Sequence, residues 1–391
     1  MPDNTTYNMS TDKRVNKKKI LIVVRWPVGG IRNFLNYLLR NFDVNNWQFT
    51  IIAPELDEMK VLLKDLNDID LIYCGTEKKP NQTKFFIKIA KLILSNNYDI
   101  VHSQGFTAAI SAAFPAYVKS LPHVITLHDI TNNKQFVGKK GIISKMIANA
   151  TLFSASKIHS VSADAHNNLL EHFPKLKKSM SKCVIIPNGI DVKRFTKSDR
   201  RDFSEELDLG EDSYFIGFFG RFMSPKGFAY LVDAMEILHR HGGLNKIPVV
   251  LAFGGGGYIR EETEVIMRKG LSDYFRFMPF TPDISAAING VDVVVMPSLW
   301  EACPLVAMET LVCGVPLIGT NCLGLREVLD GTPAKMVDMA NASALAQAIK
   351  EEIITNTKHL SESYVPEAVS RFDMVKMYNN IYKLYQEVMI R

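Results

Sequence analysis

The stretch "VDVVVMPSLWEACPLVAMETLVCGVPLIG", residues 291–319, contains two strand-like apolar runs with a helical segment between them. Val291–Met296 is rich in β-branched residues, and Leu305–Val312 is an apolar segment that follows Pro304, a residue favoured in the first turn of a helix. Pro316–Ile318 forms the second strand-like run. A strand, a helix and a strand in this order are typical of a βαβ unit with parallel strands. The stretch therefore predicts an α/β fold with a parallel sheet.

The same alternation extends through the rest of the chain. Strand candidates in the first half are Ile20–Val24, Phe49–Ala53, Leu71–Cys74, Ile100–His102, His123–Leu127, Ile158–Val161 and Val184–Pro187. In the second half they are Tyr214–Phe219, Pro248–Phe253, Phe275–Met278, Val291–Met296, Pro316–Ile318 and Ala334–Val337. Helical segments include Lys84–Leu94, Ser144–Phe153, Ala229–His239, Tyr258–Lys269, Ala342–Ile353 and a long helix at Val369–Ile390. The pattern predicts two doubly wound, Rossmann-like domains facing across a cleft.

Turn residues mark the boundary between the two domains. Pro187–Asp191 reads "PNGID", and the polar residues 197–209 follow it, which favours a linker there. We expect a disordered basic leader at 1–17, one domain at 18–196 and a second at 197–371. The helix near 372–391 either caps its own sheet or crosses back to the first domain.

Composition and charge limit the class of protein. The 391 residues are 47% hydrophobic and 22% charged, as in soluble globular proteins. No apolar run approaches the roughly 18 residues of a membrane helix, and the N-terminus lacks the apolar stretch of a signal peptide. Residues 1–200 hold 29 Lys and Arg against 16 Asp and Glu, whereas the remainder holds 17 against 25. The basic half predicts contact with an anionic partner or membrane surface, unless its lysines are simply solvated.

Two cations follow a strand of the second half. In "FFGRFMSPKG", residues 218–227, Arg221 and Lys226 lie in the loop between a strand and a helix. A guanidinium and an ammonium at this place suit a diphosphate leaving group, whose developing charge they would stabilise. Gly29 and Gly30 follow the first strand of the chain and let backbone approach an anion at a helix start. Gly254–Gly257 indicates either a nucleotide-binding loop or a tight turn.

Two glutamates lie on either side of a helix start. Glu301 precedes Pro304 in the loop, and Glu309 lies in the second helical turn. The free amides near Leu305 and Val306 would face the same cleft as Glu301. This arrangement favours one carboxylate for sugar hydroxyls, the other for a ribose diol, and the amides for a phosphate.

Histidines end two strands of the first half. His128 lies in "VITLHDIT" with Asp129 beside it, and His102 lies in "DIVHSQG". We predict a role at the site for His128 and weigh a structural role more heavily for His102. Asp68–Asp70 has D-x-D form but leads into a strand, so we interpret it as a surface turn, and no metal-ligand set emerges. Nothing in the sequence resembles a nucleic-acid-binding element.

Taken together, these motifs resemble the family-4 retaining glycosyltransferases of the GT-B fold. The resemblance covers about residues 18–391. It is carried by Gly29-Gly30, "TLHD" (126–129), "IPNGID" (186–191), "GRFMSPKG" (220–227) and the E-x7-E segment that ends in "CGVPLIG".

The resemblance implies a role for each matched residue. Arg221 and Lys226 would bind the donor diphosphate with help from Gly29 and the backbone of Gly30. Glu301 would contact the transferred sugar and Glu309 the ribose. The Leu305 and Val306 amides would hold sugar and phosphate, and His128 would lie beside the reacting carbon. The final helix would return to the N-terminal domain, and no divalent ion or other cofactor is expected.

Three departures from the family pattern affect the expected donor site. Ala302 stands where a glycine is common after the first glutamate. "NCLGLREVL" (321–329) keeps only Gly324 and Glu327 of the usual loop, and Pro279 stands where a glycine is frequent. These differences bear on donor choice.

The sequence predicts a cytoplasmic retaining glycosyltransferase. It would move a hexose from a nucleotide sugar, UDP-sugar in preference to GDP-sugar, to a glycan or lipid-linked saccharide during cell-surface polysaccharide synthesis. Peripheral contact with the anionic inner face of the plasma membrane is expected from the basic half. The alternatives are a nucleotide-sugar epimerase or hydrolase on the same scaffold, and a non-catalytic nucleotide-sugar-binding module.

Overall fold

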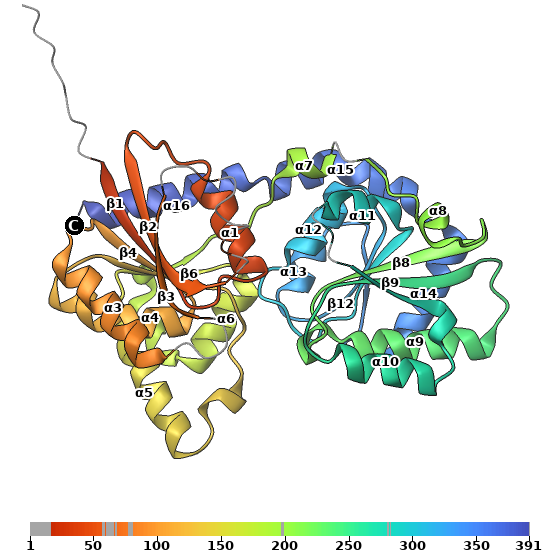
Figure 1. Cartoon of the computed structure of the whole chain (residues 1–391), viewed down its shortest axis with the longest axis horizontal. Helices are drawn as coiled ribbons and strands as arrows, with labels where there is room; N and C mark the ends of the chain where they lie inside the picture. The colour runs from red at the N-terminus through yellow and green to blue at the C-terminus, as the bar shows by residue number, and fades with distance from the viewer. Residues whose placement is uncertain are drawn as a thin grey trace, which may run out of the picture.

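The computed structural model describes residues 17–390 apart from 57–58, 60–65, 67–68, 77–80, 197–198, 280 and 282. It contains two α/β domains side by side, with the C-terminal helices running along both (Figure 1). Residues 1–16 of the predicted leader lie outside the described part, as does Asp68. Asp70 of the D-x-D sequence belongs to a strand rather than to a turn.

The N-terminal domain is built on a seven-stranded parallel sheet in the order β3-β2-β1-β4-β5-β6-β7. Its strands are β1 (Lys18–Val24), β2 (Trp47–Glu55), β3 (Ile69–Thr76), β4 (Ile100–Gln104), β5 (His123–Leu127), β6 (Lys157–Ser160) and β7 (Cys183–Ile185). Its helices are α1 (Gly30–Leu39), α3 (Gln82–Ser95), α4 (Phe106–Val118), η1 (Asn133–Phe136), α5 (Gly138–Ser154), α6 (Ala163–His172) and η2 (Pro174–Lys182).

The C-terminal domain has a six-stranded parallel sheet in the order β10-β9-β8-β11-β12-β13. Its strands are β8 (Ser213–Phe219), β9 (Ile247–Phe253), β10 (Phe275–Met278), β11 (Val293–Met296), β12 (Leu317–Thr320) and β13 (Lys335–Val337). Its helices are α7 (Val192–Thr196), α8 (Phe203–Leu207), η3 (Ser224–Lys226), α9 (Phe228–His241), α10 (Ile259–Arg268), η4 (Ser272–Tyr274), α11 (Ile284–Gly290), α12 (Leu305–Val312), α13 (Leu325–Leu329), α14 (Ala342–Thr355) and α15 (Lys358–Phe372). The last helix of the chain, α16 (Met374–Met389), follows α15.

Every strand predicted from the sequence is present, because strands covered on both faces are continuously apolar. In β1, Ile20 and Ile22 pack in one hydrophobic cluster, while Leu21 and Val23 pack in another on the opposite face. A half-exposed strand would alternate with polar residues instead. The apolar run in the sequence is thus the direct signature of helices on both sides of the sheet.

In both sheets the order in which the chain adds strands reverses at one point. In the N-terminal domain the chain adds strands on one side of β1 and then continues from β4 on the other side. In the C-terminal domain β8 and β11 are the corresponding neighbours. Loops diverge at such switch points and leave room for a ligand at the carboxyl ends of the strands.

The predicted helix at Val369–Ile390 is in fact two helices, which is a correction to the sequence prediction. The chain breaks at Asp373, whose carboxylate accepts from the Val375 amide at 2.9 Å and starts α16. Ile190 of the interdomain connection causes the break. Its amide donates to the Phe372 carbonyl at 2.8 Å and its carbonyl accepts from the Met374 amide at 2.9 Å, in place of helical partners.

Helix α16 packs on the N-terminal domain. Tyr378 of α16 contacts Phe42 edge-on, with ring centroids 4.9 Å apart, and Tyr385 lies fully buried against the same cluster. Figure 1 shows α16 lying along that domain and α15 along the C-terminal domain. The chain therefore crosses between the domains twice, at residues 186–191 and at Asp373.

Candidate functional site

The carboxyl end of the C-terminal sheet pairs two residues that the sequence analysis assigned to different parts of a donor. Lys226 ends η3, after β8, and Glu301 lies in the loop between β11 and α12. The Lys226 Nζ donates to Glu301 Oε1 at 2.7 Å, and the Ser298 hydroxyl donates to the same oxygen at 2.8 Å. The pair joins the two loops at the switch point.

Arg221 begins the loop that Lys226 ends. Its side chain is exposed, and among the described residues no hydrogen bond or ion pair holds the guanidinium. A guanidinium in this state can bind an external anion without first breaking an internal contact.

Tight contacts between backbones fix this loop. Gly227 has φ of +64°, and a Cβ there would lie 1.9 Å from the Pro297 carbonyl oxygen. Gly254 and Gly257 pack similarly, with a Cβ at 1.9 Å from the carbonyl oxygens of Gly220 and Phe222. The first and last glycines of the run after β9 therefore pack directly against the backbone of the Arg221 loop. This supports the tight turn, one of the two interpretations that the sequence left open.

Helix α12 starts without a cap from its own side chains. Pro304 is the N-cap residue, with φ −75° and ψ 119°, and the first turn holds no acidic residue. Leu305 and Val306 supply the first two amides of the helix, which have no intrahelical acceptor. An anion placed there meets free donors and the positive end of the helix.

Glu309 lies one turn further along α12 and is buried, with 2% of its surface exposed. Burial raises the pKa of its carboxyl to about 7, although the charge of Arg194 opposes the shift. Glu309 also adds to the raised pKa of Tyr37 in α1. In this structure the side chain lies in the interior toward α7 and α1. Its predicted contact with a ribose remains a prediction.

His128 extends from β5 on the N-terminal side. Its Nε2 donates to the Gln104 Oε1 at 2.7 Å, and its ring meets Phe34 edge-on at 4.8 Å. Burial, together with a smaller effect of the nearby His159, lowers the pKa of His128 to about 3. The imidazole is therefore neutral at pH 7, which suits hydrogen bonding rather than charge stabilisation.

Gln104 was missed by the sequence reasoning. It ends β4, is 2% exposed, and among the described residues its Nε2 has no hydrogen-bond partner. A buried amide donor without a partner is costly unless a ligand oxygen or water satisfies it. The sequence signal was the polar pair Ser103-Gln104 at the end of a buried strand, followed by a glycine.

Asp129, on the N-terminal side, is affected by charges on the loops of the C-terminal sheet that carry Arg221, Lys226 and Glu301. Desolvation raises its pKa, and the charge of Glu301 adds to the rise. A hydrogen bond from the Ile130 amide, at 2.8 Å, and the charges of Lys226 and Arg221 oppose it. These mutual effects put the end of β5 within electrostatic reach of the loops after β8 and β11. Asp129 was noted beside His128 in the sequence but was given no role of its own.

Gly29 and Gly30 form an open turn at the start of α1. Gly29 is the N-cap with φ of +53°, and both residues are exposed. A Cβ at either position meets nothing within 4 Å. The turn needs glycine at position 29 for its backbone conformation, while Gly30 leaves space in front of the helix amides.

His102 does not lie at the site, so its structural interpretation is the right one. It is fully buried, with Nδ1 2.6 Å from the Tyr385 hydroxyl and Nε2 2.6 Å from the Thr126 hydroxyl. Thr126 in turn bonds His159 Nδ1 at 2.9 Å, and His159 Nε2 bonds the Ile186 carbonyl at 2.7 Å.

The last bond of this chain fixes the direction of all the others. A carbonyl only accepts, so His159 Nε2 donates to Ile186, and its Nδ1 accepts from Thr126. Thr126 then accepts from His102 Nε2, and His102 Nδ1 accepts from the Tyr385 hydroxyl. Burial lowers the pKa of both histidines, which keeps the two rings neutral as this order requires.

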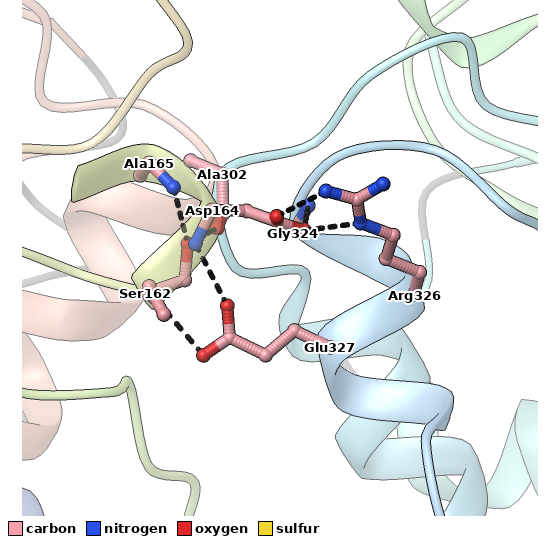
Figure 2. Close-up of polar contacts among 8 residues, drawn as sticks. Ser162, Asp164, Ala165, Ala302, Gly324, Arg326 and Glu327 are labelled. Carbon is pink, nitrogen blue, oxygen red and sulfur yellow. Dashed lines mark hydrogen bonds and ion pairs between the residues drawn. The ribbon is translucent and has the colours of Figure 1, made fainter. Parts of the chain in front are cut away.

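Helix α6 of the N-terminal domain and helix α13 of the C-terminal domain each place a carboxylate at the N-terminus of the other (Figure 2). The Glu327 carboxylate accepts from the Ala163 and Asp164 amides at the start of α6, each at 3.0 Å. The Asp164 carboxylate accepts from the Gly324 amide at the start of α13, at 2.9 Å. We call this set of contacts the interdomain clamp.

Two further contacts complete the interdomain clamp. The Arg326 guanidinium holds Asp164 through both oxygens, at 2.9 and 2.5 Å. The Ser162 hydroxyl donates to the Ala302 carbonyl at 2.6 Å, directly after Glu301. Figure 2 shows these side chains meeting between the two ribbons. The "NCLGLREVL" segment, which departs from the family pattern, is thus used to join the domains.

Neither a metal site nor a membrane span is found in the part of the chain that the structure describes. No group of three or more His, Cys, Asp or Glu side chains is arranged to hold an ion there. Among the described helices, none has the length and apolar character needed to cross a membrane.

Comparison with known proteins agrees with this architecture. Residues 28–194 match the model of "Glycosyltransferase Family 4", and residues 213–354 match "Glycosyl transferases group 1". The crystal structure of Anabaena HepE in complex with UDP-glucose superimposes with a TM-score of 0.80 at 20% identity, covering 94% of this chain and 99% of that one. This likeness shows the shared GT-B fold.

Curated relatives are also similar in sequence. A UDP-Gal:alpha-D-GlcNAc-diphosphoundecaprenol alpha-1,3-galactosyltransferase of Escherichia coli is 26% identical over 323 residues, 78% of this chain and 80% of the relative. A D-inositol 3-phosphate glycosyltransferase of Paenarthrobacter aurescens is 27% identical over 267 residues, 66% of this chain and 65% of the relative. With one family model matching each domain, the chain belongs to the family-4 glycosyltransferases of the GT-B fold.

Proposed function

We propose that this glycosyltransferase moves a hexose, with retention of configuration, from a nucleotide-diphosphate sugar to a glycan or lipid-linked saccharide. A UDP-sugar is the preferred donor. The enzyme would work in the cytoplasm on a polysaccharide that is destined for the cell surface. The observation that carries the proposal is the Lys226–Glu301 pair at the uncapped start of α12, beside the free Arg221.

The relatives support the donor and acceptor classes. The E. coli relative is named for a UDP-galactose donor and a diphosphoundecaprenol-linked acceptor. HepE was crystallised with UDP-glucose. These names support the preference for a UDP-sugar and for an acceptor carried on a lipid.

In the proposed mechanism the sugar–phosphate bond breaks and negative charge grows on the diphosphate. Arg221, Lys226 and the first amides of α12 stabilise that charge, so no metal ion is needed. Glu301 accepts hydrogen bonds from sugar hydroxyls, and Gly30 leaves room for the phosphates. Glu309 is proposed to accept from the ribose diol.

The acceptor hydroxyl attacks the same face of the sugar that the diphosphate leaves. A new carbon–oxygen bond forms, and the hydroxyl proton passes to the departing phosphate oxygen. No carboxylate is placed as a covalent nucleophile in this proposal. Neutral His128 and the free amide of Gln104 position the sugar by hydrogen bonds.

Donor screening followed by turnover tests this function. Thermal stabilisation by a panel of UDP- and GDP-sugars identifies the donor, because a ligand that binds the folded state raises its apparent stability. With that donor and a lipid-linked acceptor, we expect R221A and E301A to lower kcat/KM by about 100-fold or more. Arg268→Ala, at an exposed arginine of α10, is the matched control and should leave turnover unchanged.

Three outcomes would overturn the proposal. Near-normal rates in both R221A and E301A would remove the assigned site. Product formed from the donor alone would indicate an epimerase or a hydrolase. Donor binding without transfer to any glycan would indicate a binding module.

A further inference from the structure

Helix α5 of the N-terminal domain is apolar on the side that faces solvent. Its exposed apolar residues are Ile142 (60% exposed), Ile143 (56%), Met146 (67%), Ile147 (45%) and Phe153 (41%). Val137, directly before the helix, is 74% exposed. A soluble helix normally places polar residues on this side.

The exposed apolar residues of α5 form one continuous face. At about 100° per residue, Ile142, Ile143, Met146, Ile147 and Phe153 fall within a sector of roughly 140°. The residues that bury α5 against its own domain, Gly141, Ala148, Thr151 and Leu152, fall on the opposite side. We call the exposed sector the α5 outer face.

Lysines surround the α5 outer face and no carboxylate lies near it in sequence. Lys139 and Lys140 are exposed at the start of the helix, and Lys145 lies on its flank with Nζ over the Phe136 ring at 5.6 Å. Between Asp129 and Asp164 the chain has no Asp or Glu. The surface is therefore both apolar and cationic.

The neighbouring helices extend this character. Helix α4 packs against both α3 and α5, and it exposes Phe114 (68%) and Tyr117 (71%). Helix α3 carries Lys84, Lys88 and Lys91 and no acidic residue. Figure 1 shows α3, α4 and α5 together on one side of the N-terminal sheet, with α5 protruding furthest.

We propose that the α5 outer face inserts into the interfacial region of an anionic lipid bilayer. Aliphatic side chains flanked by lysines match a helix that lies in the membrane plane, with its apolar face among the acyl chains and its ammonium groups at anionic headgroups. A second copy of the chain is a poorer occupant, because two such faces would bring like charges together.

A short segment of chain connects this surface to the N-terminal side of the site. The chain runs from His128 and Asp129 through η1 directly into α5. Docking through α5 would therefore hold the end of β5 close to the lipid headgroups, where a lipid-linked acceptor presents its sugar. The inference deepens the proposed acceptor class, and its test needs neither donor nor acceptor.

Vesicle flotation with the full chain tests the docking surface. We expect binding to vesicles of phosphatidylcholine with 30% phosphatidylglycerol at low salt, weaker binding at 0.5 M NaCl, and little binding to phosphatidylcholine alone. The double variant I142S/M146S should lower partitioning by about tenfold or more, because two inserted aliphatic side chains are lost. Lys139→Gln with Lys140→Gln should lower it by roughly tenfold or more.

The matched control removes equally exposed apolar residues from the other domain. Met267 in α10 is 59% exposed and Ile354 in α14 is 62% exposed. The double variant M267S/I354S should bind vesicles like the unchanged chain. Thermal unfolding of all variants checks that each one folds.

The proposal is overturned if the unchanged chain ignores anionic vesicles, or if I142S/M146S binds them as well as M267S/I354S does. A dimer in sedimentation that I142S/M146S converts to monomer would assign the face to a second copy instead. Turnover of the donor with a soluble acceptor, measured without vesicles, reports separately on the proposed function.

Discussion

At the scale of single residues, the site places two glutamates of one motif in different surroundings. Glu301 is paired with Lys226 and a serine hydroxyl, whereas Glu309 is buried, with its pKa raised to about 7. The first is held in place by two hydrogen bonds to one of its oxygens. The second changes its charge near neutral pH.

The buried carboxyl predicts a pH-dependent stability. The folded pKa of Glu309 lies above its ordinary value, so the folded chain holds a proton that the unfolded chain releases between about pH 4 and 7. The stabilisation is complete below about pH 4 and is lost as pH rises through 7. Glu309→Gln has no charge to bury, so we expect its free energy of unfolding at pH 8 to exceed that of the unchanged chain by on the order of 1–3 kcal/mol. The variant should therefore unfold at a higher temperature at that pH.

Thermal unfolding between pH 5 and 8 measures this difference, which should shrink toward pH 5. Glu367→Gln, at an exposed glutamate of α15, is the control and should follow the unchanged chain throughout. Parallel curves for Glu309→Gln and the unchanged chain would contradict the assigned burial effect. If Glu309 also binds the ribose, donor affinity will fall in Glu309→Gln although stability rises.

At the scale of elements, α16 is attached to the N-terminal sheet by a buried hydrogen-bond chain as well as by packing. Tyr385 donates to His102, and the chain continues through Thr126 and His159 to the Ile186 carbonyl. Ile186 lies just before Ile190, the residue that breaks the C-terminal helix. The network therefore connects α16 to the first residue of the crossing at 186–191.

Removing the first donor of that network should be costly. Tyr385→Phe keeps the ring but leaves His102 Nδ1 without a donor in the interior, which we expect to cost about 1–3 kcal/mol. Tyr378→Phe is the matched control on the same helix. It should change the free energy of unfolding only slightly, because the half-buried Tyr378 mainly packs its ring on Phe42. Denaturant unfolding of both variants decides, and equal losses would show that the Tyr385 hydroxyl contributes nothing.

At the scale of the whole molecule, the interdomain clamp holds the two sheets in one relative orientation. Each carboxylate of the clamp satisfies helix-start amides of the other domain. Since the Glu301 loop is held by the Ser162–Ala302 contact, the clamp also fixes the site loop against the N-terminal domain. Domain orientation and site geometry are therefore coupled.

We expect Glu327→Ala to loosen this orientation. The variant leaves two amides at the start of α6 without their carboxylate acceptor, which costs about 1–2 kcal/mol. This stabilisation is lost at the interface between the domains, and the core of each domain is unchanged. Small-angle scattering should show a larger radius of gyration, and hydrogen exchange should rise at Ala163 and Asp164. Asn341→Ala removes a similar cap within one domain, that of α14, and should lower stability without changing the radius of gyration.

An unchanged radius of gyration and unchanged exchange in Glu327→Ala would show that other contacts set the orientation. The variant leaves intact the contacts of Asp164 with Gly324 and Arg326, the Ser162–Ala302 bond, and the crossings at residues 186–191 and at Asp373.

The sequence by itself determined the two sheets, because strands buried on both faces must be continuously apolar and the helices between them follow a different period. It also determined where the candidate site residues lie, since Arg221, Lys226, Glu301 and His128 each follow a strand and so lie at the carboxyl edge of their own sheet. Only the tertiary structure decided which of these residues touch. The Lys226–Glu301 pair, the exchange between Asp164 and Glu327, and the break at Asp373 all join segments far apart in the chain. Such contacts depend on how elements distant in the chain pack, within the C-terminal domain for Lys226–Glu301 and between the domains for the other two, and no local pattern of residues encodes that packing.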